Sequence, residues 1–398
     1  KFAVVHSGIH RISYNDLQAM GIDAAQVDPR RIRIYGNGGG MLSESLNDFR
    51  HNDLAENSIF VSGESDGKFD QQDYILFYGE SPHVWKYQVF SQAFNHEQNI
   101  YSDSTYYFLN VDTGVGKRIS ELAAVTEPPN VYVNKFVDYA YHERDLFSLS
   151  NIGRVWYGEK FDVTTSYEFN FSFPNIDLSS QAYFRAYVAA KSETTTSFKF
   201  LNGADEIMTA VISGIPASAN TYARPYFGFD WFTPSSPEIN LRIDYQKNIS
   251  SSIGWLNYFE INVTRNLIFS GSQMSFRDPV SVSPGNIAEF TLSNAGGNVQ
   301  IWQVTDPTNV HKISAIQTGG NQVFRMAHDT LAEFIAFDGS TYLPVYFTGK
   351  IENQDLHGVT PSKMMIITHP LFKDQAERLA DFRRHRDGMT VQVTELGN

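Results

Sequence analysis

The sequence predicts a mainly β protein that ends in the first strand–helix–strand unit of an α/β domain. Aromatic residues make up 14% of the 398 residues, and Phe, Tyr and Trp favour pleated strands. Short segments of alternating apolar and polar residues recur between turns rich in Gly, Pro, Asn and Ser, which is typical of β-sandwiches. A helical apolar spacing between two strand-like runs is found only in the last part of the chain, residues 361–398.

Residues 1–150 form the first predicted domain, which is β-rich. Ser13 and Gly21 suit the N-cap and the residue beyond the end of one short helix at 14–20. Alternation or short apolar runs predict the strands of this domain at 2–5, 9–13, 31–35, 58–63, 74–79 and 101–111.

Residues 151–265 form the second predicted domain, a β-sandwich. Its strands are expected at 168–173, 182–190, 197–201, 239–245 and 255–263. Residues 266–358 are also β-rich, with turns at 283–285 and 294–297. This stretch forms either a third β-rich domain or a return of the chain to the first sheet, and the sequence leaves both open.

Residues 359–398 form the start of an α/β domain. A continuous apolar run at 364–368 is followed by helical spacing over 372–387, by Gly388 as the residue that ends the helix, and by a second alternating strand. This order is a βαβ unit. Because one such unit cannot bury its own faces, we expect the 398 residues to be a fragment of a longer chain.

Charge and cysteine content exclude several functions. The chain holds 31 Lys and Arg against 44 Asp and Glu, a net charge of −13, which argues against a nucleic-acid partner. It has no Cys, which excludes disulfides, thiolate metal sites and a Cys nucleophile within this segment. No apolar run is long enough for a transmembrane helix.

Two loops are candidate binding sites. Residues 64–73 hold three Asp and one Glu, and Asp66, Asp70 and Asp73 are candidate calcium ligands because calcium prefers several oxygens from one loop. An acidic turn that caps strand ends is the alternative. The glycine-rich residues 36–40 follow a strand as a phosphate cradle would, but they lack the Gly-Lys-Ser/Thr ending of a P-loop. We therefore favour a turn in which backbones approach closely.

Histidines and tryptophans supply weaker candidates. His369 follows the apolar run at 364–368, where α/β sites often form, although a loop role beside Pro370 is favoured. Trp231, Trp255 and Tyr258 are candidates for stacking sugars on an exposed sandwich face. The alternative is that they are core residues.

Two adjacent pairs of titratable residues have no further ligands nearby in the sequence. We expect both to be surface contacts; they are His142–Glu143 and His328–Asp329.

A series of motifs resembles the N-terminal part of the type IX secretion system sortases, which are gingipain-type cysteine peptidases. The resemblance extends over essentially the whole chain, in the family's order. The residues that carry it are 8–17, 34–39, 66–79, 101–109, 254–262, 304–307 and 366–380.

The resemblance implies an exported protein at the outer membrane and surface of a Bacteroidota cell. Such sortases cleave C-terminal targeting domains from secreted cargo and attach the cargo to surface lipopolysaccharide, using a Cys nucleophile and a His base. Both catalytic residues lie beyond the first βαβ unit of the caspase-like, gingipain-like domain, so no catalytic or cofactor-binding residue is expected in this chain. The fragment would be an inactive scaffold that contacts outer-membrane components of the secretion system.

Two other functions stay open. One is a non-catalytic adhesive or carbohydrate-binding surface protein that shares the β-modules. The other is a general gingipain-like peptidase whose β-modules recognise substrate. A Cys and a His downstream of this segment would separate the peptidases from the adhesive protein.

Overall fold

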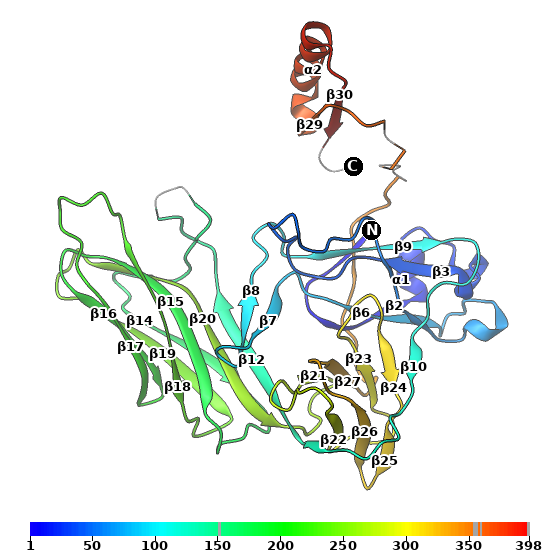
Figure 1. Ribbon diagram of the computed structural model, residues 1–398, viewed down its shortest axis with the longest axis horizontal. Helices are drawn as coiled ribbons and strands as arrows, with labels where there is room; N and C mark the ends of the chain where they lie inside the picture. The colour runs from blue at the N-terminus through cyan, green and yellow to red at the C-terminus, as the bar shows by residue number, and fades with distance from the viewer. Residues whose placement is uncertain (150–152, 353–356, 359, 396–398) are drawn as a thin grey trace. The chain divides into compact units, whose positions relative to one another are not determined.

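The computed structural model describes residues 1–149, 153–352, 357–358 and 360–395. The chain divides into two compact units, one of Phe2–Tyr346 and one of Phe347–Asn398 with Lys1. The larger unit consists almost entirely of β-sheets, and the smaller one contains a strand–helix–strand unit (Figure 1). The mainly β class predicted from the sequence is confirmed.

The N-terminal region of the larger unit has two small sheets around a common core that includes Phe2, Phe77 and Tyr107. In one sheet β1, β9, β3 and β4 are successive neighbours, and the other has the order β2-β6-β5. The strands are β1 (Phe2–Val4), β2 (Gly8–Ser13), β3 (Ile32–Tyr35), β4 (Glu56–Asn57), β5 (Phe60–Val61), β6 (Tyr74–Gly79) and β9 (Thr105–Val111). The helical segments are α1 (Tyr14–Ala19), η1 (Ala24–Gln26), η2 (Pro29–Arg31) and η3 (Glu64–Asp66).

The predicted short helix is present as α1 and begins as its sequence indicates. Ser13 is the N-cap: the N–H of Asp16 donates to its hydroxyl, and the Asp16 carboxylate accepts the Ser13 N–H at 2.7 Å. This reciprocal pair satisfies backbone donors that the first turn of a helix leaves free.

The central β-sandwich packs two antiparallel sheets face to face. One has the order β12-β20-β15-β18, with β13 beside β20, and the other has the order β14-β19-β16-β17. The first sheet comprises β12 (Lys135–Glu143), β13 (Lys160–Phe161), β15 (Ala182–Lys191), β18 (Arg224–Phe232) and β20 (Ile253–Asn266). The second comprises β14 (Ser166–Ser172), β16 (Thr196–Asn202), β17 (Asp205–Ile212) and β19 (Glu238–Gln246).

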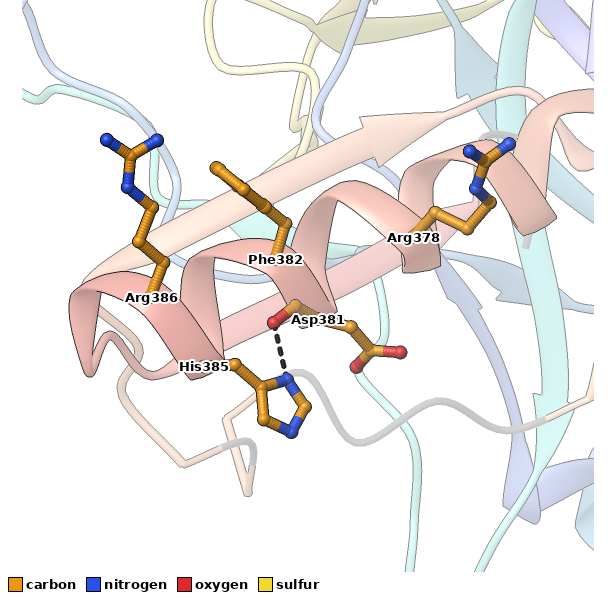
Figure 2. A pocket seen from close by; sticks show the side chains of 5 residues that line it. All are labelled: Arg378, Asp381, Phe382, His385 and Arg386. Atoms are coloured by element: carbon orange, nitrogen blue, oxygen red, sulfur yellow. Dashed lines mark hydrogen bonds between the residues drawn. The ribbon is translucent and has the colours of Figure 1, made fainter.

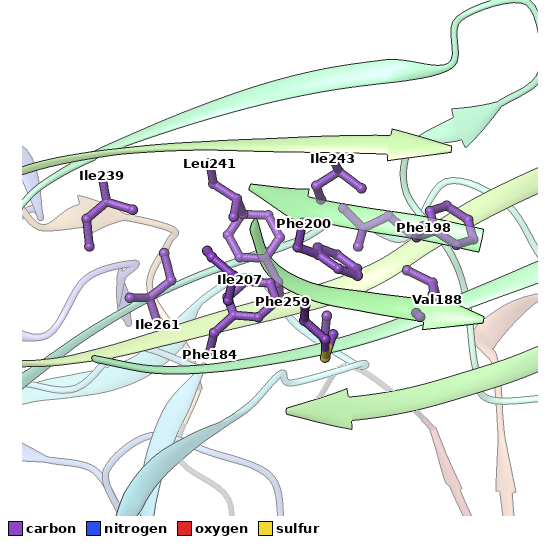
Figure 3. Close-up of a cluster of buried hydrophobic side chains, with 14 of the residues drawn as sticks. Phe184, Val188, Phe198, Phe200, Ile207, Ile239, Leu241, Ile243, Phe259 and Ile261 are labelled. Carbon is purple, nitrogen blue, oxygen red and sulfur yellow. The ribbon is translucent and has the colours of Figure 1, made fainter. Parts of the chain in front are cut away.

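Period-2 patterning builds the core of this sandwich. Alternate residues of each strand point between the sheets, so Phe184, Phe200, Leu241, Ile243 and Phe259 interdigitate there (Figure 3). The residues between them therefore lie on the two outer faces. Figure 3 shows these core side chains converging from strands of both sheets.

A second pair of sheets follows the sandwich, but each also takes a strand that precedes it. Their orders are β10-β24-β23-β27-β21 and β11-β22-β26-β25, in which β10 and β11 pair parallel with β24 and β22. The strands are β10 (Ser120–Leu122), β11 (Val131–Val133), β21 (Gln273–Arg277), β22 (Ile287–Leu292), β23 (Gln300–Gln303), β24 (His311–Ile313), β25 (Ile316–Thr318), β26 (Asn321–Ala327) and β27 (Glu333–Phe337). The sandwich is thus inserted between strands of this region.

These sheets bear on the expected domain organisation. The strands between residues 273 and 337 build two sheets, whose core includes Phe276, Phe290 and Phe334. Strand β12 lies before residue 150 but pairs along its whole length with β20 of the sandwich. The boundaries at 150, 265 and 358 themselves stay predictions.

The smaller unit contains the expected βαβ arrangement. Strands β29 (Met364–Thr368) and β30 (Val391–Glu395) pair parallel, and η4 (Pro370–Phe372) and α2 (Lys373–Asp387) connect them. Gly388 ends α2 in the left-handed conformation, at φ 59°, which favours glycine. One further short strand, β28 (Tyr346–Phe347), spans the boundary between the units.

Candidate functional site

The two outer faces of the sandwich differ in chemistry. The outer face of the β14-β19-β16-β17 sheet is polar, with residues such as Glu168, Asn170, Asn240 and Lys199 between the buried positions. This is the ordinary pattern of a sheet face in water. The outer face of the other sheet is rich in aromatic side chains and is the candidate site.

Strand register arranges the side chains of this second face in three rows across β12, β20, β15 and β18. We call the residues of the three rows the aromatic face. The rows are Tyr139, Asn262, Tyr183 and Trp231; then Tyr141, Glu260, Arg185 and Phe229; then Glu143, Tyr258, Tyr187 and Phe227.

A β-hairpin from the N-terminal region covers the β12 and β20 half of the aromatic face. Its strands are β7 (Val84–Gln88) and β8 (Ala93–Glu97), which pair antiparallel. The ring of Trp85 stacks on Tyr139 with centroids 3.9 Å apart, and the imidazole of His96 stacks on Tyr141 at 4.2 Å. Flat ring contacts therefore seat the hairpin on the sheet.

A side-chain amide fixes the hairpin in register. The N–H of Phe94 donates to Asn262 Oδ1 at 2.7 Å, and Asn262 Nδ2 donates to the Phe94 carbonyl at 2.9 Å. Both bonds are buried. Asn262 thus imitates the backbone of a neighbouring strand, and it satisfies two polar groups of β8 that would otherwise be costly to bury.

A buried ion cluster lies beside this amide. Glu260 Oε1 accepts hydrogen bonds from His96 Nδ1 at 2.5 Å, from the His96 N–H at 2.8 Å and from Arg185 Nη2 at 2.5 Å. The other imidazole nitrogen, Nε2, bonds Glu143. The side chains of Glu260 and His96 are 0% and 2% exposed, so this cluster lies inside the protein although it belongs to a sheet's outer face.

The cluster favours a protonated His96. Burial alone would lower the pKa of His96, but the hydrogen bonds and charges of Glu143 and Glu260 outweigh burial and raise it. With His96 protonated, two cations face two carboxylates and the cluster is neutral. Loss of the proton would leave an uncompensated negative charge in the interior, which is unfavourable. The cluster therefore fastens the hairpin to the sandwich.

The acidic loop is held together by its own backbone. Asp73 is buried, and its Oδ2 accepts the N–H of Asp70 at 2.8 Å, while Asp66 Oδ1 accepts the N–H of Lys68 at 2.9 Å. Among the described residues, no group of three or more His, Asp or Glu side chains is placed to hold a metal ion. Calcium binding by Asp66, Asp70 and Asp73 stays a prediction.

The glycine-rich turn at 36–40 is packed by neighbouring protein atoms. A Cβ on Gly36 would lie 2.5 Å from the ring of Tyr107, and one on Gly39 would lie 2.0 Å from a backbone oxygen. The Gly39 N–H donates to the carboxylate of Glu80 at 2.8 Å. Because a carboxylate takes the donor that a phosphate would need, the close-approach interpretation accounts for these glycines.

The surface-contact expectation for the two His pairs is wrong. His142 is half-buried, bonds Glu159 at 3.0 Å and stacks on Phe259, whereas its neighbour Glu143 points to the opposite side of β12, toward His96. These opposite directions follow from strand alternation.

In the second pair, His328 is 0% exposed and its Nε2 bonds the carbonyl of Asp278 at 2.9 Å. Only Asp329 is exposed. The pair therefore belongs half to the interior and half to the surface.

His369 has a local structural role in the smaller unit. Its Nδ1 accepts the N–H of Leu371 at 3.2 Å and caps η4. A shallow hollow lies along α2, lined by Arg378, Asp381, Phe382, His385 and Arg386 (Figure 2). All of these side chains come from one helix, and His385 Nδ1 donates to the Asp381 carbonyl at 2.7 Å. Among the described residues no second element lines the hollow, so a ligand there would touch one face of a single helix.

Two of the three residues that were candidates for stacking sugars do not present a free ring to solvent. Trp255 is buried at 3% exposure in a small cluster with Tyr157 and Ala189. Tyr258 lies under the guanidinium of Arg185. Only Trp231, at 42% exposure, presents its ring to solvent.

Sequence reasoning missed His96, Arg185 and Glu260, which form the cluster. His96 and Glu260 are 164 residues apart, and no local pattern connects them. One signal was available in β18, where aromatic residues occupy both alternating sets of positions from Tyr226 to Phe232. A strand with two apolar faces predicts that something covers its outer face.

Comparisons with known proteins place the fold. No family model matches the chain, and no curated protein matches it in sequence. Among solved structures, dimeric latent PorU from Porphyromonas gingivalis matches with a TM-score of 0.83 and 22% identity over 99% of this chain. The chain has the fold of part of PorU. This match confirms the likeness to the N-terminal part of such a protein that the motifs indicated.

The chain spans 37% of the length of that PorU chain. Another match, a CBM36 carbohydrate-binding module in complex with calcium and xylotriose, has a TM-score of 0.22 and 10% identity over 31% of this chain and 98% of the module. That score is too low to indicate a shared fold. No helix among the described residues is long and apolar enough to cross a membrane.

Proposed function

We propose that this chain is the N-terminal, non-catalytic part of a PorU-like cell-surface sortase of the type IX secretion system. The observation that carries the proposal is the PorU match over 99% of the chain, which takes in the strand–helix–strand unit as well as the β-regions. In the whole protein a thiolate would attack the carbonyl before the targeting domain of the cargo, the peptide bond would break, and the targeting domain would leave with its protonated amino group. The resulting acyl-enzyme would then be resolved by water or by an amine of the lipopolysaccharide acceptor.

The chain's own residues support a scaffolding role in this reaction. It has no Cys, so the nucleophile has to come from elsewhere in the protein. The His96–Glu260 cluster and the Asn262 amide fasten the N-terminal region to the sandwich, as a scaffold requires. The proposed partners are outer-membrane components of the secretion system, cargo C-terminal domains and surface lipopolysaccharide, at the cell surface.

Cargo processing in cells tests this function. In a strain whose gene is disrupted, cargo should accumulate with its C-terminal targeting domain uncut and should not reach the lipopolysaccharide-bound form. The intact gene should restore both, and a gene with the downstream Cys changed to Ala should not. Normal processing without the gene would contradict the sortase and favour a general peptidase.

The mass of the gene product separates the enzymes from an adhesive protein. An antibody raised against this segment should detect a product well above 45.0 kDa, the mass of these 398 residues. A product of that mass alone would leave no room for a catalytic domain, and a binding module would then be the better interpretation.

A further inference from the structure

The β15 and β18 half of the aromatic face carries large exposed rings. Phe227, Phe229 and Trp231 are 53%, 54% and 42% exposed. We call these three residues the exposed aromatic row; they follow one another at every second position of β18, the edge strand of its sheet. An apolar row of this kind on one face of a sandwich whose other face is polar marks an interaction surface.

The residues around this row make it apolar and neutral. The guanidinium of Arg185 lies over the rings of Phe227 and Tyr258, at 5.4 and 5.3 Å from their centroids, and it pairs with Glu260. Its charge is therefore already compensated, so the surface does not favour an anion. Protein–protein interfaces are enriched in aromatic residues and Arg.

Ring geometry favours a protein over a sugar. Tyr183 meets Trp231 edge to face, with 61° between the ring planes and 5.0 Å between the centroids, and it is tilted by 33° to Phe229. These rings do not form one flat platform on which a sugar chain could lie. They leave edges and crevices of the kind that other aromatic side chains fill.

The covered half of the same face shows what this surface accepts. There the occupant is a hairpin whose aromatic side chains alternate along each strand, Trp85 with Tyr87 and Phe94 with His96. The three rows run without interruption from that half into β15 and β18. Same-side residues of an extended chain repeat about every 6.6 Å, which is also the spacing of the exposed aromatic row along β18.

We propose that the exposed aromatic row is a docking surface for an extended segment of a partner protein that presents aromatic side chains at alternate positions. The segment lies beside the hairpin β7–β8 and continues its coverage of the sheet. This proposal rests on the proposed function in one respect only, namely that the partner is found at the cell surface.

Site-specific photo-crosslinking of the full-length protein at the cell surface tests this surface. The photoreactive residue p-benzoylphenylalanine replaces Phe229 in one variant and Val211 in a matched control. Val211 is 57% exposed but lies on β17, in the opposite sheet. We expect one protein adduct at position 229, none at 211, and a cross-linked partner peptide with aromatic residues at alternate positions.

Changes to neighbouring residues decide whether that adduct is specific. Phe227→Ser with Trp231→Ala should lower the yield at position 229 about tenfold or more, the usual effect of removing interface hot spots. Val211→Ser should leave the yield unchanged. These side chains are about half exposed, so each variant should stay folded at the temperature of the cross-linking, which its thermal unfolding midpoint checks.

Four results would overturn the proposal: no protein adduct at position 229, an adduct with lipopolysaccharide, an adduct with a second copy of the chain, or an adduct that the two changes do not weaken. Cargo processing in the same strains keeps the two proposals apart. Normal processing with no adduct refutes docking alone, whereas processing that does not need the gene refutes the sortase alone.

Discussion

Replacing Glu260 by Gln should loosen the hairpin β7–β8 from the sandwich while keeping the shape of the buried side chain. Glu260 Oε1 accepts three hydrogen bonds, at 2.5, 2.5 and 2.8 Å, and the side chain is 0% exposed. Each bond to a charged acceptor contributes about 1 kcal/mol more than one to a neutral acceptor, so three bonds give about 3 kcal/mol. Breaking a buried ion pair costs about 3–5 kcal/mol, which agrees with this sum.

Urea unfolding followed by tryptophan fluorescence measures this loss in the 398-residue chain, and hydrogen exchange locates it. The His96 amide, which donates to Glu260, should exchange faster in the variant. Glu289→Gln is the matched control, because Glu289 bonds Arg325 at 2.6 Å in a partly exposed pair, and such pairs contribute about 0–1 kcal/mol. Equal stabilities of the two variants, with unchanged exchange at His96, would refute the argument.

Three further changes test the same packing. His96→Gln should destabilise the chain most below about pH 6.5, the ordinary His pKa. Because the pKa of His96 is raised in the folded protein, the stability difference between parent and variant should shrink as the pH rises through that higher value. A difference in urea midpoint that stays constant from pH 5.5 to 9 would contradict this. Gly39→Ala places a Cβ 2.0 Å from a backbone oxygen and should cost about 1–3 kcal/mol or more, whereas Gly297→Ala, with nothing within 4 Å, should have little effect on the thermal midpoint. Asn262→Leu leaves the N–H and carbonyl of Phe94 buried without partners and should lower the free energy of unfolding by about 2 kcal/mol or more. An unchanged exchange rate of the Phe94 amide would contradict this prediction.

Elements with a complete local signal were predictable from the sequence. Ser13 and Asp16 form the cap expected before the short helix, and Gly388 ends α2 between two parallel strands. Each of these features depends on residues a few positions apart. The alternation of β14 likewise placed its aromatic residues toward the sandwich core.

The candidate site depends on register between distant strands, which no local pattern encodes. The hairpin β7–β8 was not predicted, although Trp85 with Tyr87 and Phe94 with His96 alternate on either side of its turn. Its partner face comes from β12 and β20, and the Phe94–Asn262 bonds span 168 residues. His328 was misassigned for the same reason, since only the fold brings Asp278 to it.

The insertion of the sandwich also sets an order in which the chain can fold. Strands β10 and β11 are synthesised before the sandwich, but their parallel neighbours β24 and β22 come after it. During synthesis from the N-terminus these two strands are unpaired edges until residues 287–313 have emerged, and such edges are open to wrong pairing. The sandwich between them has all its strands by residue 266. It can therefore close first and bring the two separated ends of the chain together through β12 and β20, which lowers the entropic cost of forming the last sheets.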